Sequence, residues 1–297
     1  MVSALCSLLF GGINARAQEL TGTLKKVADR NEIVIGHRES SIPFSYLDDA
    51  QKPIGYSIDI CNRVVDAVKA ELKRPTLQVT YAAITPSTRI PLMANGTIDL
   101  ECGSTSNTTD RQTQVGFAPT TFVTTTRFVS KRSSGFKTYA DLKGRTVATT
   151  SGTTTIKIIN EVNAKENLDW KILPAADHAE AFMMVESGRA SAFFMDDVLL
   201  YSLVARSKSP ADYVISTEPM SVEPYGIMLR RDDPAFQKVV NRAVTDLFKS
   251  GEIRTIYDKW FVKPIPPKGL TLNLPMSAPL AKVVAQPTNS GDPEAYK

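Results

Sequence analysis

The sequence predicts an α/β protein of two lobes, each a sheet covered by helices. Short apolar or alternating runs recur between segments whose apolar residues repeat every three or four positions, which is the pattern of repeated strand–helix units. The units fall into two sets, and extended Thr-rich stretches lie near 120–126 and 216–223. We therefore expect two segments to cross between the lobes and a ligand cleft to lie between them.

The first set starts with the apolar run 33–35, which predicts a buried strand. Residues 77–81 alternate as a second strand, and 97–101 predict a third, shorter one. Thr85 and Pro86 predict a helix start, as N-cap and first helical residue. A helix between the first two strands is indicated by apolar residues at helical spacing: Cys61, Val64, Val65, Val68 and Leu72.

The second set repeats this alternation. Strands are predicted at 146–149, 170–173 and 192–195. A helix opens at 151–154, after the first of these strands, and a capping box at 177–180 starts another helix after the second. This order predicts a second sheet with helices on its faces.

The chain then returns to the first lobe. Residues 225–230 predict a strand, and Asp233 with Pro234 predicts the start of a helix that Gly251 ends. Closely spaced prolines from position 264 to 267 end the packed region, and we expect the polar tail beyond them to drape over the surface or to be partly disordered. The expected organisation is a signal peptide at 1–17, a first lobe at 18–122 and 219–267, a second lobe at 123–218, and a tail at 268–297.

The N-terminus has the features of an export signal. An apolar stretch is followed by Ala15, Arg16 and Ala17, a small-x-small cleavage pattern that predicts a mature chain starting at Gln18. A short membrane anchor is the alternative, but the apolar run is too short to span a bilayer. Cys6 lacks the small residues that precede a lipoprotein cysteine, so we expect a soluble exported protein.

Removal of this segment leaves Cys61 and Cys102. An oxidising compartment permits a disulfide between them, provided that their Cα atoms lie within about 7 Å. Two buried free thiols are the alternative, and the sequence leaves both open.

Composition excludes several function classes. The formal net charge of +4 is spread along the chain, which disfavours nucleic-acid binding. Two histidines without Cys/His spacing do not predict a zinc centre, and no phosphate-binding glycine motif occurs. We expect no cofactor and no metal.

The loop 36–46 follows the first strand and carries Arg38, three serines and a tyrosine. Ligands of open α/β sheets bind at the carboxyl ends of strands, and the planar guanidinium pairs well with a carboxylate or phosphate. The helix start at 151–154 offers free N–H groups that suit a carboxylate. Arg89 and Arg111, with Asp196 after a strand, complete a set that complements a ligand with two carboxylates and one ammonium.

Each candidate has a structural alternative. Arg38 could pair with Glu39, and Arg111 with Asp110. The remaining candidates are equally typical of helix surfaces, helix caps and first helical turns: Arg89, Thr153, Thr154, His178 and Asp196.

The chain resembles the bacterial periplasmic solute-binding proteins for polar amino acids, above all the glutamate/aspartate-binding proteins of ABC transporters. The resemblance extends to about residue 267, and the order and spacing of its motifs are specific. The matching stretches are Gly36-His37-Arg38-Glu39-Ser40-Ser41-Ile42-Pro43-Phe44-Ser45-Tyr46, Arg89-Ile90-Pro91-Leu92, Asn95-Gly96-Thr97-Ile98-Asp99-Leu100-Glu101-Cys102-Gly103-Ser104-Thr105, Asp110-Arg111-Gln112, Thr150-Ser151-Gly152-Thr153-Thr154, Glu186-Ser187-Gly188-Arg189-Ala190 and Met195-Asp196-Asp197.

The resemblance implies a two-lobed type II periplasmic binding protein that closes on one amino acid and delivers it to a membrane-embedded ABC permease. It implies that Asp196 takes the ligand α-ammonium. It also implies that the side-chain carboxylate is held by Arg38, Arg89 and His178. The α-carboxylate would be held by Arg111 with N–H groups and hydroxyls of Ser104, Thr105, Ser106, Thr153 and Thr154.

One departure from the family pattern concerns the side-chain subsite, because Pro86 stands where the family tends to carry a hydroxyl residue. We expect a monomeric periplasmic binding protein for L-glutamate or L-aspartate and no enzymatic activity. Two rival functions are a periplasmic dehydratase of the cyclohexadienyl type on the same fold and an amino-acid sensor module. No nucleophile-plus-base motif supports the enzyme.

Overall fold

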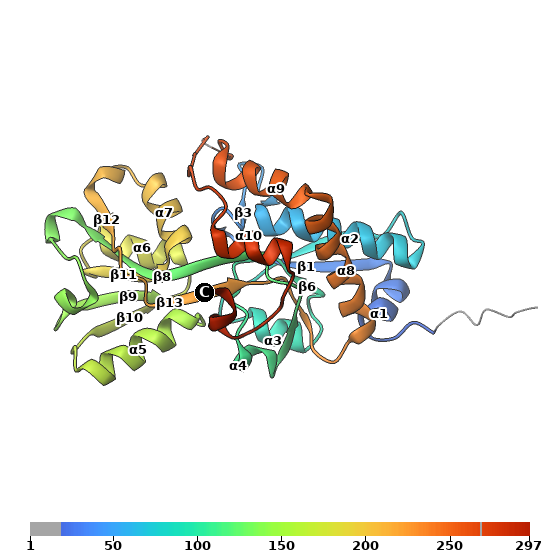
Figure 1. The fold of residues 1–297 in the computed structure, drawn as a ribbon, viewed down its shortest axis with the longest axis horizontal. Helices are drawn as coiled ribbons and strands as arrows, with labels where there is room; N and C mark the ends of the chain where they lie inside the picture. Colours follow the sequence, from blue (N-terminus) through green and yellow to red (C-terminus); the bar gives the residue numbers. More distant parts are fainter. Residues whose placement is uncertain (1–18, 268) are drawn as a thin grey trace, which may run out of the picture.

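The computed structural model describes residues 19–267 and 269–297. The predicted signal peptide, its cleavage site and Cys6 lie outside these residues, and so does the first position of the predicted tail. Within them the chain forms two lobes, each a mixed sheet between helices (Figure 1).

The first lobe contains a five-stranded sheet in the order β5-β1-β6-β14-β7. Its first three strands are parallel, whereas β14 runs antiparallel to both of its neighbours. The strands are β1 (Glu32–His37), β5 (Gln78–Ala83), β6 (Leu100–Glu101), β7 (Val115–Phe117) and β14 (Met228–Arg230). A small second sheet joins β2 (Ser40–Ser41), β3 (Ser45–Leu47) and β4 (Pro53–Ile54).

Helices cover both faces of the main sheet of this lobe (Figure 1). Those on one face are α1 (Gly22–Arg30), α2 (Tyr56–Leu72), α8 (Pro234–Ser250) and α9 (Glu252–Tyr257), followed by a short π-helix, η4 (Asp258–Val262). The shorter α3 (Arg89–Ala94) and α4 (Thr109–Gln112) lie on the other face. The apolar face of α8 is buried, as its spacing predicts: Phe236, Val239, Val240, Ala243, Val244 and Leu247.

The second lobe is built on a six-stranded sheet in the order β10-β9-β11-β8-β12, with β13 paired to β8. Its strands are β8 (Phe122–Lys131), β9 (Thr146–Thr150), β10 (Lys171–Ala175), β11 (Ala192–Asp196), β12 (Tyr213–Ile215) and β13 (Ser221–Tyr225). Its helices are α5 (Thr154–Glu166), α6 (His178–Glu186) and α7 (Asp197–Arg206), with short 3-10 turns η1 (Arg132–Ser134), η2 (Tyr139–Leu142) and η3 (Pro210–Asp212).

Two antiparallel strands connect the lobes. In β8 and β13, Phe122 lies opposite Tyr225 at the first lobe, and both rings pack edge-on against Phe44, with ring centroids 4.9 and 5.1 Å away. Figure 1 shows both strands running from one lobe into the other. The lobe boundaries drawn at 122/123 and 218/219 stay predictions, and they fall beside these two strands.

Three element predictions were wrong in their bounds. Helix α3 begins at Arg89, not at Thr85, because the Thr85 and Thr88 hydroxyls accept each other's backbone N–H and close a separate turn. The strand predicted at 225–230 is divided, since Tyr225 ends β13 and the chain changes sheet before Met228. The strand predicted at 97–101 is limited to its last two residues.

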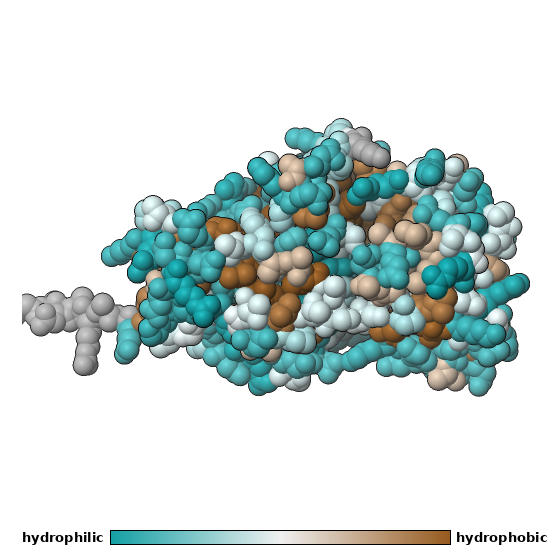
Figure 2. All heavy atoms as spheres, turned by 180° about the vertical axis from the view of Figure 1, so that it is seen from behind, coloured by the Kyte–Doolittle hydropathy of each residue, from teal (hydrophilic) through white to brown (hydrophobic). Residues whose placement is uncertain are grey.

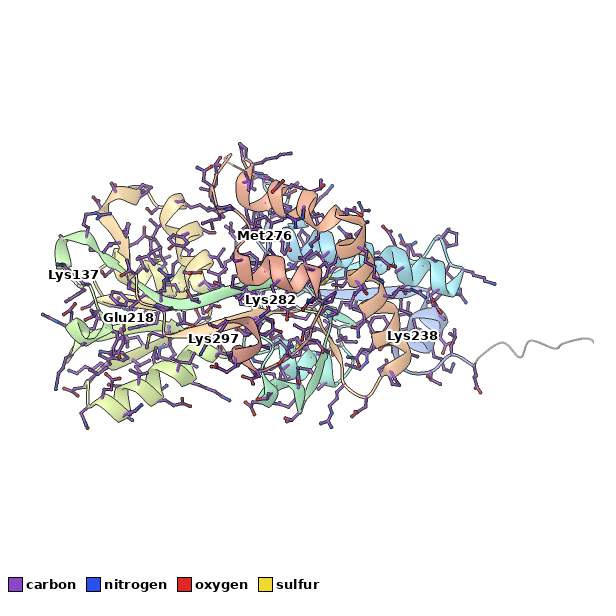
Figure 3. The ribbon with its side chains drawn as sticks, viewed as in Figure 1. Lys137, Glu218, Lys238, Met276, Lys282 and Lys297 are labelled. Atoms are coloured by element: carbon purple, nitrogen blue, oxygen red, sulfur yellow. A yellow bond between two sulfur atoms is a disulfide. The ribbon has the colours of Figure 1, made fainter. Side chains whose placement is uncertain are left out.

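The tail is packed, which corrects the expectation that the prolines end the packed region. It forms α10 (Ala278–Ala285) and η5 (Pro293–Tyr296), and Figure 3 labels Met276, Lys282 and Lys297 along its path across the middle of the molecule. Leu280, Val283 and Tyr296 are buried in the main core, against α8, β8 and β13. Apolar residues at helical spacing within this Pro-rich stretch indicate the helix, but the polar, Pro-rich composition of the tail favoured an unpacked segment instead.

No helix among residues 19–267 and 269–297 is long and apolar enough to cross a membrane. On the face seen in Figure 2, apolar residues form small patches between hydrophilic ones.

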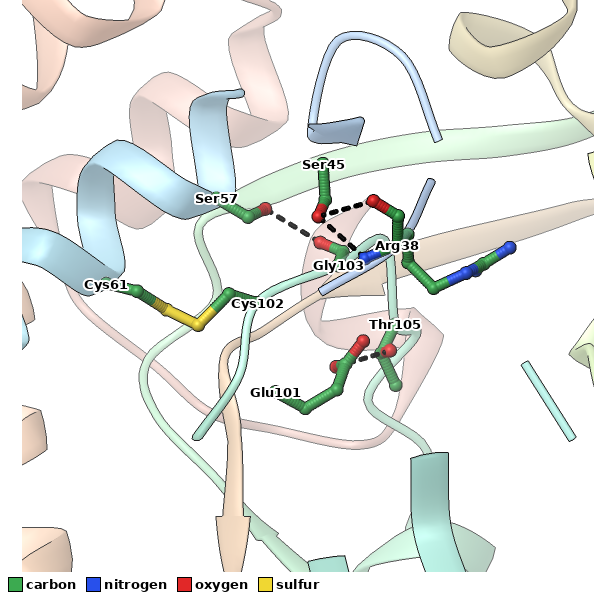
Figure 4. The surroundings of a disulfide bond; sticks show 8 residues. All are labelled: Arg38, Ser45, Ser57, Cys61, Glu101, Cys102, Gly103 and Thr105. Atoms are coloured by element: carbon green, nitrogen blue, oxygen red, sulfur yellow. Dashed lines mark hydrogen bonds between the residues drawn. A yellow bond between two sulfur atoms is a disulfide. The ribbon is translucent and has the colours of Figure 1, made fainter. Parts of the chain in front are cut away.

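Cys61 and Cys102 form a disulfide, with Cα atoms 6.3 Å apart, and this decides between the two alternatives that the sequence leaves open. The bond ties α2 to the segment after β6, next to Arg38 and Glu101 (Figure 4). It therefore anchors a loop that carries candidate ligand-binding residues.

Loss of this disulfide should destabilise the protein. It closes a loop over a sequence separation of 41 residues, and such a cross-link is worth about 2–4 kcal/mol. Urea unfolding of the Cys61→Ala/Cys102→Ala variant should give a free energy of unfolding lower by that amount, and a reductant should lower it in the wild type only. Equal stability of the two proteins would show that the bond contributes nothing.

Candidate functional site

Arg38 is the most distinctive side chain of the site. It directly follows β1 and is 1% exposed, and its backbone N–H donates to Ser45 Oγ at 2.8 Å (Figure 4). Among the described residues, neither terminal nitrogen of its guanidinium has a hydrogen-bond partner. Burial, together with the charge of Arg89, lowers its pKa to about 9, so it remains a cation at neutral pH. A buried cation of this kind marks a position for an anion.

Two further arginines line the same cleft. Arg89 is 2% exposed, and its Nη1 donates to Thr105 Oγ1 at 2.6 Å, while its Nε has no partner within the described part of the chain. Arg111 donates from Nη1 to the Ser106 carbonyl at 2.8 Å. Burial lowers the pKa of both, that of Arg111 to about 9.

The lobes meet at Gly152. Its carbonyl accepts from Arg89 Nη2 at 3.4 Å and from Arg111 Nη2 at 3.2 Å, and both arginines belong to the first lobe. Gly152 has φ +73°, and a Cβ there would lie 2.6 Å from the backbone nitrogen of Ser87, so only glycine fits. An exposed ion pair between Lys157 and Asp110, at 2.6 Å, joins the lobes at the surface. The structure therefore shows the cleft closed.

Asp196 provides the acidic side of the cleft. It is 3% exposed and accepts hydrogen bonds from Thr126 Oγ1 at 3.1 Å and from the Tyr225 hydroxyl. Burial and the neighbouring Glu223 raise its pKa to about 7. Although Asp196 is the N-cap residue of α7, its side chain makes no capping hydrogen bond, so a capping role does not explain it.

His178 is fully buried in the first turn of α6. Burial, with the charges of Arg38 and Arg89, lowers its pKa well below 6.5, so the ring is neutral at pH 7. Its Nδ1 lies 2.9 Å from Thr150 Oγ1, and its Nε2 has no partner among the residues that the structure describes. The free nitrogen can make a hydrogen bond without adding charge.

The five predicted hydroxyl residues divide into two groups. Ser104 Oγ is buried and has no partner in the described chain. The three threonine hydroxyls bond within the protein: Thr153 caps α5, Thr154 donates to Glu223, and Thr105 donates to Glu101. Ser106 contributes its carbonyl to Arg111. Ser104 and Ser106 therefore keep hydroxyls that make no hydrogen bond within the described residues, and the segments carrying all five line the cleft.

The structural alternatives for two arginines are wrong. Asp110 pairs with Lys157 across the cleft, not with Arg111. Arg38 forms no ion pair with Glu39 in the described part of the chain. Both guanidinium groups are buried in the cleft instead.

Sequence reasoning missed two buried acids in this site. Glu101 is fully buried at the end of β6, and its Oε1 has no partner among the described residues. Glu223 is 4% exposed on β13 and accepts from Thr154 at 2.9 Å and from Ser221 at 2.7 Å. The available signals were an acid inside the strand predicted at 97–101 and another at the end of the extended stretch 216–223, since charged residues are rarely buried without a partner or a function.

Both lobes also line a hollow of about 510 Å³ beside Arg111, which includes Ile90 and Thr108 from the first lobe and Thr153 and Glu223 from the second. No group of three or more His, Cys, Asp or Glu side chains that could hold a metal ion occurs in the described residues. The arrangement suits a small zwitterion with an additional negative charge.

Comparison with known proteins gives a family match. Residues 33–263 match the family described as bacterial extracellular solute-binding proteins, family 3. The L-glutamate/L-aspartate-binding protein of Pseudomonas aeruginosa is 53% identical over 274 residues, covering 92% of this chain and 91% of that protein. The glutamate/aspartate import solute-binding protein of Escherichia coli is 45% identical over 267 residues, covering 90% and 88%.

Solved structures share the architecture. An ancestral arginine-binding protein bound to arginine superimposes with a TM-score of 0.70 at 26% identity, covering 78% of this chain and 99% of that one. An ancestral amino acid-binding protein, described as a precursor of cyclohexadienyl dehydratase, gives a TM-score of 0.67 at 27% identity, covering 80% and 99%.

Proposed function

The chain belongs to family 3 of the bacterial extracellular solute-binding proteins, and we propose that it binds L-glutamate or L-aspartate between its lobes and delivers it to a membrane-embedded ABC permease. Its fold is the two-lobed type II periplasmic binding protein. The names of its relatives at 53% and 45% identity support the ligand class. The single observation that carries the choice of an acidic amino acid is the buried guanidinium of Arg38, whose terminal nitrogens have no hydrogen-bond partner among the residues that the structure describes.

The proposed roles of the residues follow from their charges. Arg111 binds the α-carboxylate together with the segments 104–106 and 153–154, and Asp196 binds the α-ammonium. Arg38, Arg89 and the neutral His178 hold the side-chain carboxylate. Each of these side chains has at least one nitrogen without a hydrogen-bond partner in the described part of the chain, which supports this role. Glutamine would leave one arginine without a charge partner, and a site built for particular hydrogen bonds rejects ligands that lack them.

In this role the protein is a monomeric periplasmic carrier and not an enzyme. The relatives are named as binding proteins, which supports the carrier role over an enzymatic one. One solved neighbour is described as a precursor of cyclohexadienyl dehydratase, so an enzyme on this fold is the second candidate. Such an enzyme could use the neutral His178 ring as a base and Asp196, whose pKa is raised, as an acid. A sensor role would need a separate receptor.

A thermal-shift panel of amino acids tests the ligand class. A ligand at about 100 times its Kd stabilises the folded protein by about 2.7 kcal/mol. Glutamate or aspartate should therefore raise the Tm of the ligand-stripped protein by several degrees, whereas glutamine and arginine should leave it nearly unchanged. A shift with another amino acid and none with glutamate or aspartate would overturn the proposed ligand, and dehydration of a cyclohexadienyl acid would favour the enzyme.

A further inference from the structure

A row of hydroxyl groups connects two buried carboxyl groups in the second lobe. The oxygens of Asp196 and Thr126 lie 3.1 Å apart, those of Thr126 and Ser221 2.8 Å apart, and those of Ser221 and Glu223 2.7 Å apart. The row follows from sheet register, because Thr126 on β8 lies opposite Asp196 on β11 on one side and opposite Ser221 on β13 on the other.

The outer ends of the row are occupied. The second oxygen of Asp196 accepts from the Tyr225 hydroxyl, and the second oxygen of Glu223 accepts from Thr154 Oγ1 at 2.9 Å. Both carboxyl groups are almost completely buried, with exposures of 3% and 4%. Within the described chain, no other side chain bonds to the Thr126 or Ser221 hydroxyl.

The number of protons decides the charge of this row. Three oxygen–oxygen contacts need three protons, but the hydroxyls of Thr126 and Ser221 supply only two. If both carboxyl groups were ionised, one contact would place two lone pairs against each other at hydrogen-bond distance in a buried site, which is costly. One carboxyl group must therefore supply the third proton.

We propose that Asp196 and Glu223 hold a single proton between them, and that the hydroxyls of Thr126 and Ser221 relay it from one carboxyl group to the other. When Asp196 carries the proton, it donates to Thr126, which donates to Ser221, which donates to Glu223. Reversal of all three hydrogen bonds moves the proton to Glu223 and leaves Asp196 ionised. Atoms and charge balance, because each oxygen that gives one proton receives another.

This relay matches the requirement of an amino-acid ligand, and in this respect it rests on the proposed function. An α-ammonium at Asp196 favours the arrangement with Asp196 ionised and Glu223 protonated. The ammonium then meets the negative charge of Asp196, and Glu223 adds no second negative charge beside it. Glu223 is in this sense a positioning residue, which acts on the ligand through the charge of Asp196.

Other charged or titratable groups face the carboxyl pair from three directions: Arg89 and Arg111 from the first lobe, the neutral phenol of Tyr225 from β13, and Asp197 from α7. Asp197 is partly neutralised by Arg127, whose Nε lies 3.3 Å from its carboxylate. The arginines favour ionisation of the pair, whereas burial and the mutual repulsion of the two carboxylates oppose it. The raised pKa of Asp196, about 7, agrees with retention of one proton at neutral pH.

Carbon-13 NMR of protein labelled at the side-chain carboxyl carbons of Asp and Glu tests the proposal directly. At pH 7 with saturating unlabelled glutamate, one Glu Cδ should have the chemical shift of a protonated acid, and Glu223→Gln should remove that signal. Without ligand, the pair should likewise hold one proton at pH 7, and Ser221→Ala, which interrupts the row, should change the chemical shifts of both carboxyl carbons. Fully ionised carboxyl groups at pH 7 in both states, or loss of the proton when glutamate binds, would overturn the proposal.

Affinity provides a second readout, through a matched pair of variants. The amide of Glu223→Gln can always donate to Ser221, as the protonated acid does. Glu223→Ala instead removes the hydrogen-bond partner of Ser221 at this end of the row. Calorimetry at pH 7 should show glutamate bound at least about tenfold more tightly by the Gln variant than by the Ala variant. Equal affinities would contradict the relay. Failure of glutamate to bind the wild type would reject the proposed function, while the ligand-free spectra would still decide whether the proton is held.

Discussion

Arg111→Ala should weaken glutamate binding by about thirtyfold or more. Removal of one partner from a buried charge pair costs about 2–5 kcal/mol, which is more than a factor of ten in affinity. Arg111 is 7% exposed, and it also joins the lobes through the Gly152 carbonyl, so its loss removes both the ligand contact and a contact of the closed state. Titration calorimetry on ligand-stripped protein measures the change.

An exposed arginine provides the control for this experiment. Arg74→Ala removes the same charge from an exposed position between the end of α2 and the start of β5, and should leave the affinity within error of the wild type. If Arg111→Ala behaved like Arg74→Ala, the proposed grip on the α-carboxylate would be wrong.

Arg38→Met should change the choice of ligand more than the fold. Methionine fills much of the space of the aliphatic stem but has no charge, so the side-chain carboxylate of glutamate would lose its partner. We expect glutamate affinity to fall by about thirtyfold or more and glutamine affinity to fall much less, so that the preference for glutamate collapses. Calorimetry with both amino acids on the wild type and the variant gives the ratio.

A stability measurement distinguishes a ligand-binding role of Arg38 from a structural role in its loop. The buried guanidinium of Arg38 has no partner for its terminal nitrogens in the described residues, so its removal relieves a desolvation penalty in the ligand-free closed state. Ligand-free Arg38→Met should therefore unfold at the same or a higher urea concentration than the wild type. A less stable variant that loses glutamate and glutamine equally would show that Arg38 is structural.

The alternation of strands and helices could be predicted because it depends on local periodicity. The apolar face of α8 and the strands that precede Arg38 and Asp196 are readable within windows of a few residues. The positions of Arg38 and Asp196 at the ends of strands followed from the same reading. The bounds of the elements were harder to predict. Helix α3 is an example, because side-chain hydrogen bonds of Thr85 and Thr88 form a separate turn at the predicted helix start.

By itself, therefore, the sequence determined the fold class, the order of its strand–helix units and most of the charged residues of the cleft. Only the tertiary structure decided which distant residues meet: the pairing of Cys61 with Cys102, the packing of the tail, and the row from Asp196 to Glu223. The physical reason is that these contacts depend on sheet register and on burial. Thr126 lies between Asp196 and Ser221 only because β8 pairs with both β11 and β13, and no local pattern encodes that arrangement.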